Sequence, residues 1–161
     1  MQTVAELAVP AGYFHAPFGP LAVYDDGEFV TALSFGPHHC IGPRPTRLTC
    51  EAVRQLRSFF AQPGFAFSLP VKPVGTAFQQ RVWTALQQIP RGSVLTYGQL
   101  AEQLGSSARA VGGACRANPL PLIIPCHRVV ASTSLGGYAG HTSGDTFDIK
   151  RWLLEFEQAA W

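Results

Sequence analysis

The stretch LTYGQLAEQLGSSARAVGGACRANP, residues 95–119, has the pattern of two short helices joined by a tight turn. Thr96 and Gln99 have the spacing of a capping box, which marks the start of the first helix. Gly105 supplies its stop, and the two serines that follow can cap a second helix, which an Asn-Pro pair closes. The stretch therefore predicts a helix-turn-helix.

The second of these helices combines charge with an absence of side chains. Helical spacing places Arg109, Gly113 and Arg116 on one side. A glycine inside a helix costs on the order of 1 kcal/mol relative to alanine, so the pair Gly112 and Gly113 needs a physical reason. One reason is close contact with another helix. The other is close approach to a phosphate backbone, with the arginines binding charge at its edges.

A second distinctive stretch is IIPCHRVV, residues 123–130. Free cysteine is often buried as a small hydrophobe, so Cys126 can be interpreted as a core residue. His127 and Arg128, however, are costly beside an apolar segment, and positive charge favours the thiolate, which is the nucleophilic form. Taken alone, this stretch leaves open whether Cys126 is a core residue or a reactive thiol.

The cysteine pattern and the absence of a targeting segment favour a reducing compartment. The cysteines Cys40, Cys50, Cys115 and Cys126 show no CxxC spacing, so we expect thiols and no disulfides. The first nineteen residues lack the basic start and apolar run of a secretory signal, and no apolar segment is long enough to cross a membrane. We therefore expect a cytoplasmic protein.

Positive charge is concentrated in the second half of the chain. The whole chain has a net charge of +2, while the segment from Arg81 to Arg128 holds five arginines and the single acid Glu102. A local basic zone of this kind is typical of proteins that bind polyanions.

Two domains are expected, in an α/β fold. Residues 13–35 indicate short antiparallel strands with hairpin turns, and a helix is expected from about Thr46 to Ala61. The stretch that follows, up to about residue 75, predicts a further strand and a proline-rich connection. We place an N-terminal α/β domain at residues 1–72 and a mainly helical, winged-helix-like domain with the helix-turn-helix at residues 73–161.

Four segments, in this order, resemble the O6-alkylguanine-DNA alkyltransferases. They are RGSVLTYGQLA, ARAVGGACRANPLP, IIPCHRVV and the terminal IKRWLLEFE. The resemblance covers about residues 75–157, and the N-terminal region is similar only in layout. It implies direct, irreversible transfer of an alkyl group from O6-alkylguanine in double-stranded DNA to a cysteine, with O4-alkylthymine as a further candidate substrate. It implies no cofactor and a monomer that reacts once, and it leaves cooperative binding to DNA open.

The resemblance also implies catalytic roles. Cys126 corresponds to the alkyl acceptor, and His127 to the base that takes the thiol proton through a water. Glu157 corresponds to the carboxylate that orients this histidine, at the margin of an apolar stripe. Asn118 corresponds to the residue that links the recognition helix to the acceptor, and Tyr97 to the residue that helps rotate the nucleotide outward and protonates the departing guanine. The expected stripe comprises Ile149, Trp152, Leu153 and Phe156.

The remaining implied residues bind DNA and line the substrate pocket. In this family the second helix lies in the minor groove, and Arg109 corresponds to the arginine that fills the place of the flipped nucleotide. The expected DNA-binding residues are Tyr97, Arg109, Ala110, Gly112, Gly113, Arg116 and Arg128. The expected pocket residues are Pro121, Tyr138, Ala139 and Gly140. Ala139 departs from the serine frequent in the family, and loop 135–147 is longer than expected.

Other functions are weighed against this one. His38, His39 and Cys40 suggest zinc, but their adjacency lacks the spacing of a zinc finger, and we expect no metal. A lesion-binding protein of the alkyltransferase-like type would lack the acceptor cysteine. A cysteine hydrolase using Cys126 and His127 would turn over. One alkyl group per protein, none, or many would distinguish the three.

Overall fold

The computed structural model describes residues 12–36, 45–138 and 145–161. The chain forms two compact units, residues 1–74 and 75–161, which divide close to the boundary expected at Lys72. In the described part of both units, every helix is too short or too polar to span a membrane.

The first unit contains the predicted antiparallel sheet. Strands β1 (Gly12–Ala16), β2 (Gly19–Asp25) and β3 (Val30–Phe35) pair in the order β1-β2-β3. The DDG turn forms the second hairpin, in which the carboxylate of Asp26 accepts the backbone N–H groups of Glu28 and Phe29 at 2.9 and 2.8 Å. Local turn chemistry thus sets the register of the sheet.

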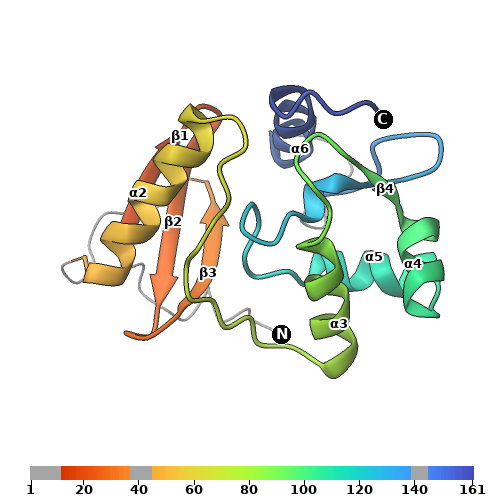
Figure 1. Ribbon diagram of the computed structural model, residues 1–161, viewed down its shortest axis with the longest axis horizontal. Coiled ribbons are helices and arrows are strands. Elements are labelled where there is room, and N and C mark those ends of the chain that lie inside the picture. The colour runs from red at the N-terminus through yellow and green to blue at the C-terminus, as the bar shows by residue number, and fades with distance from the viewer. Residues whose placement is uncertain (1–11, 37–44, 139–144) are drawn as a thin grey trace. The chain divides into compact units, whose positions relative to one another are not determined.

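Helix α2 (Arg47–Ala61) lies against this sheet (Figure 1). The helix was expected to begin at about Thr46; this residue is its N-cap and also donates a 2.6 Å hydrogen bond to Asp25 at the end of β2. The stretch after α2 forms only an isolated bridge between Val71 and Val30 instead of the expected strand. The surrounding prolines lack the N–H groups that a longer ladder needs. The buried core of this unit includes Leu21, Val23, Val30, Ala52, Leu56 and Phe59.

The second unit begins with the predicted helical segment. Helices α3 (Ala77–Leu86), α4 (Tyr97–Leu104) and α5 (Ala108–Arg116) pack together (Figure 1). The capping box of Thr96 and Gln99 is formed, and Gly105 ends α4 at a φ of 64°. Helices α4 and α5 are therefore the predicted helix-turn-helix.

Side chains on α3 hold this motif. The indole nitrogen of Trp83 donates to the carbonyl of Ala114 on α5 at 2.9 Å. The guanidinium of Arg81 donates to the carbonyl of Leu104, at the end of α4, at 2.8 Å. Both contacts satisfy backbone carbonyls near the ends of the two helices.

A short parallel pairing connects the helix-turn-helix to the rest of the unit. Strand β4 (Leu95–Thr96) pairs with β5 (Val129–Val130), which directly follows the 3₁₀ turn η1 (Cys126–Arg128). Helix α6 (Asp145–Phe156) ends the fold and contacts η1. This pairing brings the start of α4 next to the segment that contains Cys126.

Candidate active site

Cys126 begins η1 in a tightly constrained segment. The residue is 6% exposed, and its backbone N–H donates to the carbonyl of Ile124 at 2.8 Å. Leu122, four residues earlier, has a φ of 74°, a left-handed conformation that costs a non-glycine residue about 1–2 kcal/mol. The fold therefore maintains a strained backbone close to the thiol.

Asn118 links helix α5 to this segment. Its amide nitrogen donates to the carbonyl of Ile124 at 2.8 Å, and its amide oxygen accepts the N–H of Leu120 at 2.9 Å. Its own N–H donates to the carbonyl of Cys115, near the end of α5. The structure thus places Asn118 where the sequence expected a bridging residue.

His127 and Glu157 form a buried pair. The imidazole Nε2 lies 2.9 Å from Oε1 of Glu157, and both side chains are fully buried. Burial opposes ionisation of Glu157, but hydrogen bonds from His127 and Arg128 bring its pKa to about 2. An ionised carboxylate only accepts hydrogen bonds, so Nε2 carries the proton and Nδ1 keeps its lone pair.

The histidine is poised as a neutral base. Burial lowers the pKa of His127, against the opposing effect of Glu157, so the imidazole is uncharged near neutral pH. Its buried Nδ1 accepts no hydrogen bond from any residue that the structure describes. This nitrogen is therefore available to take a proton.

The Cys126 thiol is protonated at rest, contrary to what the positive charge in its sequence suggested. Burial raises its pKa, against the opposing effects of a hydrogen bond from Asn118 and the charge of Lys150. A thiol of this kind needs a base before it can attack.

The structure corrects the expectation that Arg128 binds DNA. Its Nε and one terminal nitrogen donate to the two oxygens of Glu157 at 3.0 and 2.7 Å, and its other terminal nitrogen donates to the carbonyl of Ile89 at 2.8 Å. The side chain is 11% exposed. All three guanidinium nitrogens donate inside the unit and little of the side chain is exposed, so Arg128 belongs to this buried site and is not presented as a DNA-binding side chain.

Lys150 is a buried residue of this site that sequence reasoning missed. Its ammonium group donates to the carbonyls of Val129 at 2.7 Å and Gly137 at 2.9 Å. The Gly137 carbonyl also accepts the hydroxyl of Tyr97 at 3.4 Å, and Lys150 lies over the Tyr97 ring. Burial lowers the pKa of Lys150 to about 8 and raises that of Tyr97. Lys150 therefore connects β5, Tyr97 and the segment next to Tyr138.

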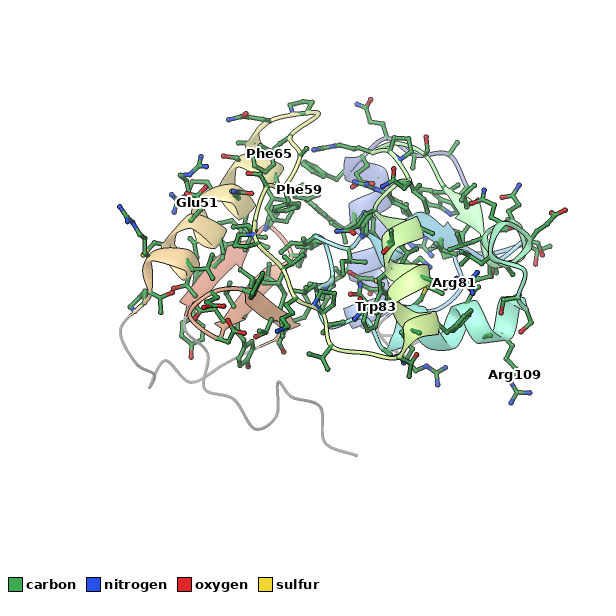
Figure 2. All side chains as sticks on the ribbon, turned by 60° about the horizontal axis from the view of Figure 1, so that its bottom comes forward. Glu51, Phe59, Phe65, Arg81, Trp83 and Arg109 are labelled. Atoms are coloured by element: carbon green, nitrogen blue, oxygen red, sulfur yellow. The ribbon has the colours of Figure 1, made fainter. Side chains whose placement is uncertain are left out.

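Helix α5 presents the expected exposed face. Arg109 and Arg116 are exposed, and Arg109 extends away from the helix (Figure 2). A Cβ atom added at Gly112 or Gly113 would meet nothing within 4 Å, apart from the helix's own nearby backbone. The glycine pair is therefore not explained by contact with another helix. Ala110 is half-buried at the edge of this face.

Only some of the residues expected to line a substrate pocket lie within the described ranges. Pro121 and Tyr138 are both buried in the second unit. Ala139 and Gly140 lie outside the described residues, as do His38, His39 and Cys40. Within the described ranges, no three histidine, cysteine or acidic residues are grouped as a metal site would require.

Comparison with known proteins gives a consistent result. Residues 77–159 match the family model described as the DNA-binding domain of 6-O-methylguanine DNA methyltransferase. The methylated-DNA-protein-cysteine methyltransferase of Mycobacterium leprae is 42% identical to this chain, and the match covers 89% of this chain and 88% of the relative. The enzyme of the same name from Methanosarcina acetivorans is 38% identical, and the match covers 89% of this chain and 95% of the relative.

A solved structure shares the fold. The crystal structure of Mycobacterium tuberculosis OGT in complex with DNA superposes with a TM-score of 0.74 at 36% identity, and the match covers 91% of this chain and 93% of that one. The match includes both the α/β unit and the helix-turn-helix unit, so the likeness extends well beyond the acceptor motif. The chain belongs to the methylated-DNA-protein-cysteine methyltransferase family.

Proposed function

We propose that this protein repairs DNA by irreversible transfer of an alkyl group from O6-alkylguanine to Cys126. The observation that carries the proposal is the buried Cys126 thiol, tied through Asn118 to an exposed arginine-glycine helix face. The adjacent pair of His127 and Glu157 supplies a neutral base. O4-alkylthymine is a second candidate substrate.

The proposed reaction is a single displacement. The thiol proton passes through a water to Nδ1 of His127, and the sulfur then attacks the alkyl carbon attached to O6. The new S–C bond forms as the C–O6 bond breaks, and its electrons leave with guanine, which takes a proton from Tyr97. Exchange of protons with solvent restores His127 and Tyr97. No step calls for a cofactor.

One event inactivates the protein. The product is a thioether, which offers no acyl-like carbon for water to attack, so the thiol is not regenerated. We further propose that it acts in the cytoplasm, where a reducing environment keeps the acceptor as a thiol.

DNA recognition follows from the exposed face of α5. We propose that α5 enters the minor groove, where Gly112 and Gly113 allow close approach and the bases are read mainly by shape. The target nucleotide rotates outward into the pocket, and Arg109 occupies the space that it leaves. The protein binds as a monomer, and cooperative binding along DNA is compatible with this arrangement.

Mass spectrometry of the intact protein tests the proposed function. After incubation with excess methylated duplex DNA, we expect one methyl group per molecule, located on Cys126 by peptide mapping. Repeated removal of methyl groups by one molecule would indicate a hydrolase. Tight DNA binding with no mass increase would indicate a lesion-binding protein.

The glycine pair gives a second test. Gly113→Ala is expected to stabilise α5 by about 0.5–1 kcal/mol and to raise Tm by roughly 1–4 °C, because its Cβ meets no neighbouring atom. The same methyl group would obstruct approach to DNA and raise Kd about tenfold or more.

Thermal melting and DNA titration of the same sample check this prediction. The higher Tm serves as the control, since a variant that lost affinity by unfolding would melt at a lower temperature. Unchanged affinity in the stabilised variant would exclude close approach at Gly113.

A further inference from the structure

We propose that Arg128 is a positioning residue for the catalytic base: by occupying both oxygens of Glu157, its guanidinium keeps Nδ1 of His127 free to accept a proton. The inference rests on the proposed function, in which Nδ1 receives the thiol proton. It assigns Arg128 a role inside the site in place of a contact with DNA.

The geometry of the three side chains supports this role. Two nitrogens of Arg128 donate to the two oxygens of Glu157, and Oε1 is shared with Nε2 of His127. The third contact of the guanidinium, to the carbonyl of Ile89, fixes its orientation. Glu157 is therefore held by a cation on one side and by the imidazole on the other.

Charge balance explains why the cation matters. A buried carboxylate next to a histidine draws a proton onto the pair, because an unpaired buried charge is costly. Arg128 supplies the positive charge that this carboxylate needs, and its own charge lowers the pKa of His127. The pair can therefore stay without the additional proton near neutral pH.

An additional proton would disable the base in either position that it could take. Protonated on both nitrogens, His127 has no lone pair left. With the proton on Glu157 instead, the carboxyl group donates to Nε2, and the ring proton moves to Nδ1. The pair titrates as a unit, and both protonated forms block Nδ1.

Other titratable or charged groups lie around this pair and are unaltered in the test. They are Cys126 on η1, Lys150 on α6, Arg91 in the segment after α3, and Tyr138 in the segment before residue 139. Because none of them is altered, a difference between Arg128 variants reports Arg128 itself.

The experiment measures the single-turnover transfer rate from methylated duplex DNA between about pH 5 and pH 9, with protein in excess. In wild type the rate falls on the acid side, as His127 becomes protonated. In Arg128→Met this acid limb is expected to move up by about one pH unit or more, with the rate recovering at high pH. Arg128→Lys retains the charge and is expected to keep the limb near its wild-type position.

A matched control and a second background complete the design. Arg151→Met removes the same charge from an exposed position on α6 and is expected to leave the profile unchanged. In a Glu157→Gln background, which has no carboxylate to neutralise, Arg128→Met should shift the acid limb by clearly less than in the wild-type background, because only the direct effect of the guanidinium charge on His127 remains. If Arg128→Met alone does not fold, Arg128→Gln, which keeps a hydrogen-bond donor but carries no charge, replaces it in both backgrounds.

The outcomes separate this inference from the proposed function. An Arg128→Met variant with a lower rate at every pH but an unshifted acid limb would overturn the positioning role. So would an equal shift of the acid limb by Arg128→Met with and without Glu157→Gln. A wild-type protein that transferred no methyl group at any pH would instead contradict the proposed function.

Discussion

Cys126→Ser is expected to abolish alkyl transfer while leaving binding to alkylated duplex DNA intact. A serine hydroxyl is a far weaker nucleophile than a thiol, and His127 cannot make up the difference, so the rate should fall by roughly a thousandfold or more. Serine is close to cysteine in size, so the constrained segment around Ile124 should keep its conformation. Transfer of label from DNA to protein and DNA titration measure the two effects.

The other thiols provide the control. Cys115→Ser and Cys50→Ser are expected to transfer normally. Burial raises the pKa of Cys115 to about 12, so its thiolate is scarce, and it has no base assigned to it. Stoichiometric transfer by Cys126→Ser, lost again on replacing Cys115, would show that Cys115 is the acceptor.

Arg109→Ala is expected to slow transfer from duplex DNA far more than it weakens binding. Flipping a nucleotide costs a few kcal/mol, so loss of the group that fills the vacated space should slow repair roughly tenfold to a thousandfold. Single-turnover rates at saturating protein, measured beside Kd, separate the two effects.

Arg116 is the matched control for Arg109. It is exposed about two helical turns further along α5. Arg116→Ala should weaken binding and its salt dependence, with little change in the saturated rate. Free benzylguanine needs no flipping, so Arg109→Ala should react with it almost normally. An equal loss of rate in both variants would contradict a role for Arg109 in the base stack.

The helix-turn-helix was predictable from sequence because its signals are local. Thr96, Gln99 and Gly105 act within one turn of the positions that they cap, so spacing alone identifies the ends of α4. The interpretation of the glycine pair was not decided by local signals. Only the structure shows that the space next to Gly112 and Gly113 is open.

Charged residues were harder to place, because their partners are distant in the chain. Arg128 was expected on DNA, but its partner Glu157 lies 29 residues away, and no local pattern reports that pairing. Lys150 did leave a local signal. It is buried with Leu153, Leu154 and Glu157 at helical spacing, whereas the stripe proposed from sequence was rotated toward half-buried residues. A lysine on the inner side of α6 could have been recognised as a buried cation.

The carbonyl of Ile124 accepts two hydrogen bonds, one from the side chain of Asn118 and one from the backbone of Cys126. A displacement of α5 can therefore reach the reactive thiol through one oxygen atom. Thermodynamic linkage makes such a connection reciprocal: if docking on DNA changes the free energy of the acceptor, the chemical state of the acceptor changes the affinity for DNA by the same factor. The fold thus provides a physical route by which a reacted molecule and a fresh one can differ in how long they stay on the duplex.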